Sequence, residues 1–208
     1  SMIEEGEGSE ARLVADLSTS ATLRGRHNAQ NASAAIATAR TLGLTDAEID
    51  AGLKSFPGLH HRLEVIGSVG RVSFINDSKA TNADATEKAL MSFEDGVFWI
   101  AGGRSKEGGI SSLKPLFDRV EEAFLIGEAA DSFAQTLKGI LPYRMSGTLD
   151  QALIEAHEAA EKSLSKNPVV LLSPACASYD QFKNFEERGD FFRVAAAKLP
   201  GFTPYVKR

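Results

Sequence analysis

The apolar run at residues 97–101, Val-Phe-Trp-Ile-Ala, constrains the fold more than any other stretch of this chain. A strand with apolar residues at consecutive positions presents apolar side chains to both faces of its sheet. Both faces must therefore be covered by other elements. The run predicts a buried strand inside a sheet that has helices on both sides.

From residue 59 onward, strand-like and helix-like segments alternate. Expected strands occupy residues 63–66, 71–75, 97–101, 123–126, 143–145 and 169–172, and expected helices occupy residues 84–90, 113–120, 129–137, 149–164 and 186–197. The glycine-containing residues 67–70 separate the first two strands and predict a hairpin. Alternating elements with short loops predict an α/β fold with a Rossmann-like, mostly parallel sheet, one antiparallel strand from the hairpin, and helices on both faces.

The first 58 residues have a different character. Residues 4–10 are acidic and spaced by glycines, which predicts a loop, and residues 12–17 predict a short strand. Residues 29–42 predict an alanine-rich helix that stops at Gly43, and Thr45 with Glu48 forms a capping box at the start of another helix. These elements are too few to enclose a core alone. We therefore expect two parts, residues 1–58 and 59–208.

Composition excludes several classes of protein. The net charge is -5 and the chain has no basic cluster, which argues against general binding to nucleic acid or to a membrane surface. The longest apolar runs, such as residues 169–172, have the length of strands and are too short to span a membrane. A single cysteine, and the lack of a secretory pattern at the start, make the cytoplasm the expected compartment.

Polar residues concentrate in three loops that follow expected strands. Residues 76–82 read Asn-Asp-Ser-Lys-Ala-Thr-Asn, residues 101–109 carry four glycines with Arg104 and Lys106, and residues 173–185 combine small residues with hydroxyls. Open α/β sheets bind ligands at the carboxyl ends of their strands, and helix N-termini favour anions. A capped turn explains the first loop equally well apart from its lysine, and a flexible glycine turn is the alternative for the second loop.

The sequence gives little support for a metal site or for a reactive cysteine. His60 and His61 are adjacent and point apart, His27 precedes a helix, and His157 lies at the edge of an amphipathic helix, where we expect it at the surface. No carboxylate or cysteine shares a ligand spacing with them, so no metal site is predicted. Cys176 has no histidine nearby in sequence, and a small buried thiol is its commoner state.

Several motifs together resemble those of the Mur ligases, and within them the branch that adds D-glutamate. They are residues 23–31, His61-Arg62, residues 76–82, Gly102-Gly103 with Lys106, and residues 173–189, whose pattern S-P-A-C-A-S-x-D-Q-F-K-N-F-E-x-R-G is long and specific. The resemblance covers about residues 11–200 and implies a three-domain enzyme. Residues 1–58 would be the tail of its central ATP-binding domain, and residues 59–208 its C-terminal amino-acid-binding domain.

The resemblance also implies a reaction. ATP, with Mg²⁺, would phosphorylate the carboxylate of UDP-N-acetylmuramoyl-L-alanine, and the amine of D-glutamate would attack the acyl phosphate. The family's phosphate loop, magnesium ligands and carbamylated lysine would lie outside this chain, so we expect the chain alone to be inactive. We also expect a monomer.

The resemblance assigns roles to individual residues. Asn28, Asn31, Arg62, Asp77 and Lys79 are expected to contact the nucleotide, while Thr81, Lys106, Ser178 and Phe185 are expected to bind D-glutamate, with Lys79 and Lys106 as catalytic residues. Anionic nucleotides and intermediates need fixed positive charge and N–H donors, which the three loops supply. Two alternatives remain: a Mur-type ligase that adds another amino acid, and a nucleotide-binding module without chemistry of its own.

Overall fold

The computed structural model describes residues 2–5, 12–17, 22–23, 26–105 and 108–205 of the chain. The chain divides into two compact units, Ser1–Gly58 and Leu59–Arg208. The division falls where the sequence changes character. We describe each unit by itself.

The first unit contains an antiparallel pair of strands, β1 (Met2–Glu5) and β2 (Arg12–Asp16), and two helices, α1 (Arg26–Thr41) and α2 (Asp46–Ser55). Its buried apolar residues form two small clusters, one around Ile36 and Ile49 and one around Leu17 and Leu23. The expected loop at residues 4–10 is wrong for residues 4 and 5, which pair with β2. Strand pairing uses backbone N–H and C=O groups, so it does not require an apolar pattern in the sequence.

The capping box at the start of α2 is confirmed. Thr45 accepts a hydrogen bond from the Glu48 N–H at 3.4 Å, and the Thr45 N–H donates to Glu48 Oε2 at 2.8 Å. These two bonds satisfy backbone donors that a helix N-terminus otherwise leaves unpaired.

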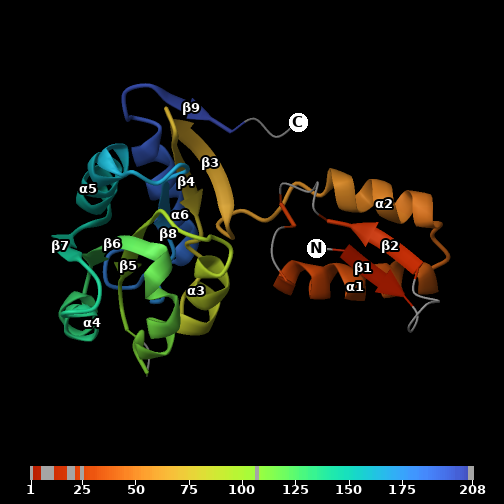
Figure 1. Cartoon of the computed structure of the whole chain (residues 1–208), viewed down its shortest axis with the longest axis horizontal. Helices are drawn as coiled ribbons and strands as arrows, with labels where there is room; N and C mark the ends of the chain where they lie inside the picture. The colour runs from red at the N-terminus through yellow and green to blue at the C-terminus, as the bar shows by residue number, and fades with distance from the viewer. Residues whose placement is uncertain (1, 6–11, 18–21, 24–25, 106–107, 206–208) are drawn as a thin grey trace. The chain divides into compact units, whose positions relative to one another are not determined.

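In the second unit, the described residues form one sheet of seven strands. The strands are β3 (Glu64–Val69), β4 (Val72–Asn76), β5 (Val97–Gly102), β6 (Val120–Ile126), β7 (Tyr143–Gly147), β8 (Val169–Leu172) and β9 (Phe202–Pro204). Their order is β7-β6-β5-β8-β4-β3-β9 (Figure 1). Strands β4 to β8 pair in parallel, and β3 pairs antiparallel with β4 and β9. The predicted mostly parallel α/β sheet is confirmed.

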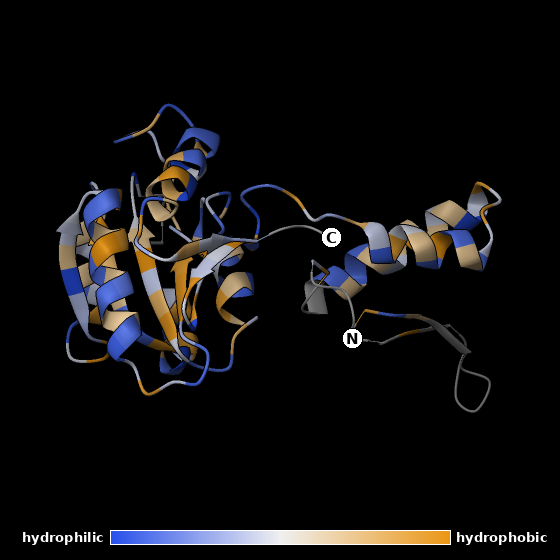
Figure 2. Cartoon of the chain, turned by 90° about the horizontal axis from the view of Figure 1, so that it is seen from above, coloured by the Kyte–Doolittle hydropathy of each residue, from blue (hydrophilic) through white to orange (hydrophobic). Residues whose placement is uncertain are grey.

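Helices cover both faces of this sheet. They are α3 (Ala83–Leu90), η2 (Ser111–Arg119), α4 (Ala130–Leu137), α5 (Leu149–Lys162) and α6 (Phe185–Ala196). Trp99 of β5 packs with residues of α3, η2 and α4, whereas its neighbours Phe98 and Ile100 pack with α5 and α6. The helices accordingly carry apolar and hydrophilic stripes (Figure 2). As predicted, β5 is buried along its whole length.

Some element boundaries differ from the prediction. Residues 111–119 form a 3-10 helix and not an α-helix: Pro115 lies inside it, and in an α-helix the proline ring would clash with the carbonyl four residues earlier. The strand β3 continues through Val69, so the hairpin turn contains only Gly70 and Arg71. Leu164, expected on the apolar stripe of α5, follows the end of that helix and is fully exposed.

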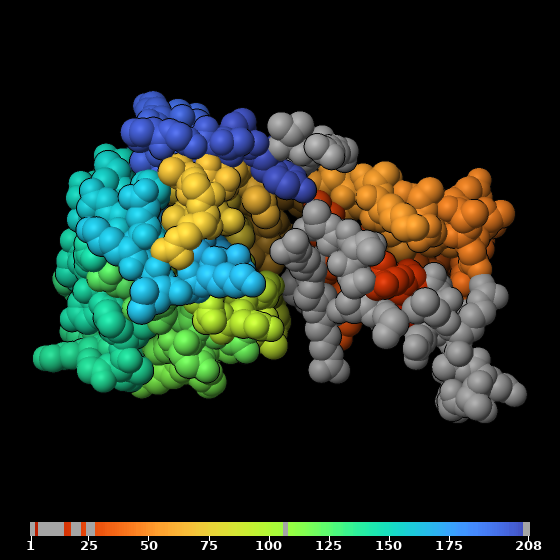
Figure 3. All heavy atoms as spheres, turned by 45° about the horizontal axis from the view of Figure 1, so that its top comes forward, coloured from red at the N-terminus to blue at the C-terminus, as the bar shows by residue number. Residues whose placement is uncertain are grey.

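The sequence did not predict strand β9. Its three residues pair with Gly67, Ser68 and Val69 of β3, and the Phe202 ring lies 5.9 Å from the Phe74 ring. In the space-filling view, the last described residues lie along β3 (Figure 3). A three-residue strand is too short to show a periodic pattern in the sequence, so the sequence could not predict it. In the structure, β9 is defined by its pairing with β3 and by the packing of Phe202.

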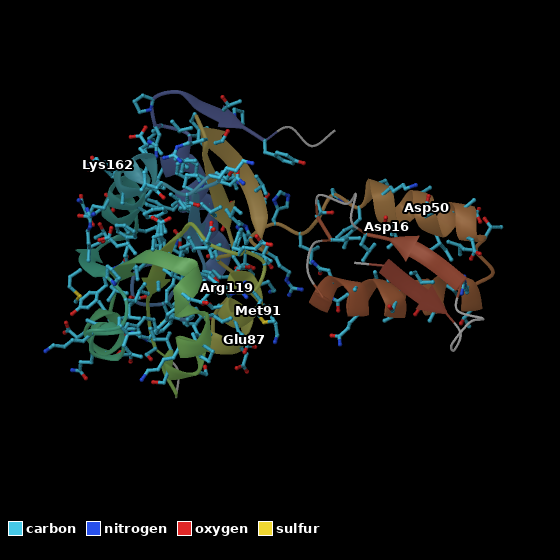
Figure 4. The ribbon with its side chains drawn as sticks, viewed as in Figure 1. Asp16, Asp50, Glu87, Met91, Arg119 and Lys162 are labelled. Atoms are coloured by element: carbon cyan, nitrogen blue, oxygen red, sulfur yellow. The ribbon has the colours of Figure 1, made fainter. Side chains whose placement is uncertain are left out.

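Two arginines form hydrogen bonds at the amino-terminal ends of the parallel strands. Arg119 donates to the carbonyl of Phe93, just beyond α3 (Figure 4). Arg71 donates to the carbonyls of Glu161, Ser163 and Ser165 around the end of α5. Cations at helix C-termini satisfy carbonyls that the helix leaves unpaired. Both arginines therefore stabilise the fold at the amino-terminal ends of the strands. The carboxyl ends of the strands do not take part in these bonds.

In the part of the chain that the structure describes, no helix is both long and apolar enough to cross a membrane.

We expect Gly102→Ala to destabilise the second unit by at least about 3 kcal/mol, because the backbone there is strained for any side chain. Gly102 has a φ of 128°, and an added Cβ would lie 1.9 Å from the Ile126 carbonyl oxygen. The matched control is Gly139→Ala, at a φ of 74° with no atom within 4 Å of the added Cβ, which should cost about 1 kcal/mol. Urea unfolding followed by Trp99 fluorescence measures both, and equal costs would contradict the expectation.

Candidate functional site

Three loops lie at one edge of the sheet. The strands β5, β8 and β4 are neighbours in the sheet and run parallel, so their carboxyl ends lie together. The described residues of the loops that follow them are 77–82, 103–105 with 108–109, and 173–184. These are the three loops that the sequence singled out, and they converge where doubly wound sheets bind ligands.

Backbone hydrogen bonds join the second loop to the third. The Gly102 N–H donates to the Pro174 carbonyl at 2.9 Å, and Arg104 and Ala177 exchange two bonds of 2.9 and 3.1 Å. A Cβ on Gly103 would lie 2.4 Å from the Ala177 carbonyl oxygen. The glycines of this loop therefore allow close approach of two backbones, and the flexible-turn alternative does not describe residues 102–104.

A buried arginine joins the first loop to the third. Arg188 of α6 is 1% exposed; it donates to Ser78 Oγ at 3.0 Å, to the Ser78 carbonyl at 2.8 Å and to the Cys176 carbonyl at 3.1 Å. Burial lowers the pKa of its guanidinium to about 10. Among the described residues, no carboxylate forms an ion pair with Arg188. The site thus contains a buried positive charge that bonds only neutral oxygens.

Sequence reasoning missed Arg188. The residue belongs to the long motif at residues 173–189, but Glu186, Glu187 and Asp190 surround it in sequence, which is typical of a solvated helix face. A signal was present, because Arg188 lies four positions before the apolar Phe192 on the buried side of α6.

Asp77 is a buried carboxylate at the end of β4. It is 5% exposed, and it accepts hydrogen bonds from the Leu63 N–H at 3.1 Å and from the Ser173 hydroxyl at 2.8 Å. Burial raises the pKa of Asp77 to about 7, although these two bonds and the positive charge of Arg62 oppose the shift. Asp77 is therefore close to half-protonated at neutral pH, which ordinary aspartates are not.

Asn76 and His61 hold the first loop in place through buried hydrogen bonds. The Asn76 amide donates to His61 Nδ1 at 3.2 Å and to the Gly189 carbonyl at 3.0 Å, and its oxygen accepts from the Ser78 N–H at 3.2 Å. The His61 carbonyl in turn accepts from the Lys79 N–H at 2.9 Å. Burial lowers the pKa of His61, which agrees with a neutral ring that accepts at Nδ1.

Lys79 and Phe185 lie together, although they come from different loops. The Lys79 side chain is exposed, and its Nζ lies 4.2 Å from the centre of the Phe185 ring. Such a contact orients the ammonium group and leaves it accessible to a ligand. Thr81 is half-buried on the same loop, and its N–H donates to the Lys79 carbonyl.

Several donors of the third loop and of the start of α6 have no partner among the described residues, and two of them belong to site residues that the sequence predicted. The hydroxyl of Ser178 is one of them, although this residue is only 3% exposed. The other is the N–H of Phe185, the first residue of α6. The N-cap side chain of Asn184 satisfies only the Glu187 N–H, at 2.7 Å. Unpaired donors at a helix N-terminus form a site for an anion.

Of the remaining predicted site residues, Arg62 lies near the first loop, where its charge acts on Asp77. Arg62 is exposed beside His61. Asn28 and Asn31 lie on α1 in the first unit, and Lys106 lies outside the described residues. The structure thus brings together Arg62, Asp77, Lys79, Thr81, Ser178 and Phe185.

The expectation that His157 lies at the surface is wrong. It is 8% exposed and packs against the Phe74 ring at 5.6 Å, because it lies four positions after Leu153 on the apolar stripe of α5. Cys176 is completely buried, and burial raises its pKa to about 12, so its thiol stays protonated. Among the described residues, no group of three His, Cys, Asp or Glu side chains is arranged to hold a metal ion.

The fold and the loops define a class of protein: a doubly wound α/β domain in which polar loops converge at the carboxyl ends of the parallel strands. Comparison with known families narrows this class. The model of the Mur ligase, glutamate ligase domain, matches residues 61–176. The chain belongs to the Mur ligase family.

Relatives of known name agree with this assignment. A UDP-N-acetylmuramoylalanine--D-glutamate ligase of Agrobacterium fabrum is 56% identical over 206 residues, which are 99% of this chain and 44% of that protein. A ligase of the same name from Brucella abortus is 56% identical over 191 residues, covering 92% of this chain and 41% of that protein. The chain thus spans about two fifths of the length of these relatives.

Two solved structures share the fold. The UDP-N-acetylmuramate-alanine ligase MurC of Thermotoga maritima has a TM-score of 0.60 at 20% identity, covering 84% of this chain and 39% of that one. MurF of Acinetobacter baumannii has a TM-score of 0.61 at 22% identity, covering 82% of this chain and 38% of that one.

The raised pKa of Asp77 predicts a pH-dependent stability. The folded state holds this proton up to about pH 7, whereas the unfolded chain releases it near 3.8, so the contribution of Asp77 to stability is lost as the pH rises through this window. Between pH 5 and 8, the stability of the wild type should fall by about 3 kcal/mol relative to Asp77→Asn. Urea unfolding of both proteins across this range measures the difference, and parallel curves would mean that the pKa of Asp77 is ordinary.

Proposed function

We propose that this chain is the C-terminal part of an ATP-dependent ligase that joins D-glutamate to UDP-N-acetylmuramoyl-L-alanine in peptidoglycan synthesis. The supporting relatives are 56% identical and carry that activity in their names. In this proposal, residues 1–58 are the tail of the central ATP-binding domain, and residues 59–208 are the amino-acid-binding domain. The enzyme works as a cytoplasmic monomer.

One observation carries the amino-acid-binding role. Among the described residues, neither the Ser178 hydroxyl of the third loop nor the N–H of Phe185, the first residue of α6, has a hydrogen-bond partner. D-glutamate brings two carboxylates, and hydrogen bonds from such donors to charged acceptors are stronger than neutral ones. Ser178 and Phe185 take the side-chain carboxylate, while Thr81 and Lys106 supply further contacts to the amino acid.

The first loop faces the nucleotide. Asp77 accepts from the ribose hydroxyls, Arg62 lies towards the phosphates, and Asn28 and Asn31 contact the adenine. Binding as an acceptor favours the ionised form of Asp77, so nucleotide should lower the raised pKa of this group. Lys79 serves both substrates, since its ammonium is exposed and oriented by Phe185.

The chemistry forms an amide bond. ATP phosphorylates the carboxylate of UDP-N-acetylmuramoyl-L-alanine, the amine of D-glutamate attacks the acyl phosphate, and inorganic phosphate leaves. Lys79 and Lys106 offset the negative charge that develops on the intermediate. Magnesium would neutralise the phosphates, and its ligands belong to the part of the enzyme that precedes this chain.

We expect Ser178→Ala in the full-length enzyme to raise the KM for D-glutamate about tenfold, because it removes one hydrogen bond to a charged group. The matched control is Ser146→Ala, which removes a buried hydroxyl on β7 that bonds Glu155 and lies outside the three loops. Steady-state phosphate release gives both values. An unchanged KM for Ser178→Ala would remove this residue from the site.

Lys106→Ala should reduce turnover by at least about 100-fold, because it removes a charge that acts on the intermediate. A lysine in a glycine-rich loop contributes little packing, so the melting temperature should stay within about 2 °C. Phosphate release and thermal unfolding measure the two quantities. A large loss of stability with intact turnover would refute the assignment.

A further inference from the structure

Arg104 has no role in the chemistry described so far, yet it lies beside the proposed amino-acid site. Its backbone exchanges two hydrogen bonds with Ala177, the residue before Ser178. The neighbouring Gly103 is so close to the buried arginine that an added Cβ would lie 3.3 Å from Arg188 Nη1. Arg104 is thus anchored to the loop that carries Ser178.

The side chain of Arg104 pairs with a carboxylate on a fourth loop. It donates to both oxygens of Glu128, at 3.2 and 3.1 Å, and Glu128 follows the end of β6. The N–H of Glu128 donates to Asp180 Oδ2 at 3.1 Å, and Asp180 lies two residues after Ser178. Two carboxylates therefore border the turn that contains Ser178, and Arg104 pairs directly with Glu128, whose N–H is bonded to the other carboxylate, Asp180.

The charges of Arg104, Glu128 and Asp180 affect how an acidic ligand approaches the Ser178 turn. Glu128 and Asp180 would repel a ligand that carries two carboxylates, and Arg104 offsets that charge. The ion pair with Glu128 is exposed on both sides, at 54% and 55%. An exposed pair contributes little to the stability of a fold, so removing it should affect the ligand more than the fold.

We propose that Arg104 is a positioning residue for the acidic amino acid: it neutralises Glu128 and Asp180 beside the Ser178 turn, so that the ligand enters without repulsion. The inference rests on the proposed function and extends it to a residue that does not itself contact the reacting atoms.

The test uses the full-length enzyme and the neutral variant Arg104→Gln. The KM for D-glutamate should rise about tenfold, with kcat within about twofold, because only entry of the anion is affected. Arg144→Gln is a matched control, since Arg144 makes the same kind of bidentate pair with Glu122, at 2.8 and 3.0 Å, between β7 and β6. This control should leave the KM unchanged. An unchanged KM in Arg104→Gln would overturn the proposal.

A second variant separates neutralisation from mechanical support. Arg104→Gln combined with Glu128→Gln restores the net charge of the turn but still lacks the ion pair. Neutralisation predicts that the KM returns to within about twofold of the wild type, whereas a role in holding the loops predicts no recovery. A KM that stays high therefore overturns the proposal. If the wild-type enzyme shows no turnover that depends on D-glutamate, the proposed function itself fails, and this inference fails with it.

Discussion

The site depends on one buried charge. The guanidinium of Arg188 donates to oxygens of Ser78 and Cys176, which belong to loops after different strands. Removing a charge from water is costly, and these bonds to neutral oxygens recover part of that cost. Because the bonds reach two loops at once, the shape of each loop depends on the position of the other. One side chain therefore organises the loops at the carboxyl ends of β4 and β8.

Other polar groups extend this buried network. Ser78 donates from its hydroxyl to the Phe185 carbonyl at 2.8 Å, which fixes the start of α6 against the first loop. Ser173 bonds Asp77, and its carbonyl accepts from the Trp99 indole at 2.7 Å, in the centre of the sheet. The same low dielectric that raises the pKa of Asp77 strengthens these hydrogen bonds. These hydrogen bonds hold the first loop and the start of α6 together, and the Lys79 side chain is exposed above them.

Much of the fold follows from local patterns in the sequence. The apolar run of β5, the capping box at Thr45 and the polar residues after three strands all describe local environments correctly. Where the sequence was misleading, contacts between distant residues decide the structure. Glu186 and Glu187 made Arg188 resemble a solvated residue, and the burial of His157 depends on Phe74 from another strand. The order of the strands, which brings the three loops together, cannot be read from their sequence alone.

The position of β8 also has a consequence for how the protein folds. This strand is the last of the parallel strands in sequence, but it lies between β4 and β5 in the middle of the sheet. Arg188 must then contact Ser78, which lies 110 residues earlier in the sequence. Contacts at such separations close long loops, so they form late and slowly. During synthesis, the ribosome must release the chain beyond α6 before the sheet can close, and the binding site is among the last parts of the molecule to form.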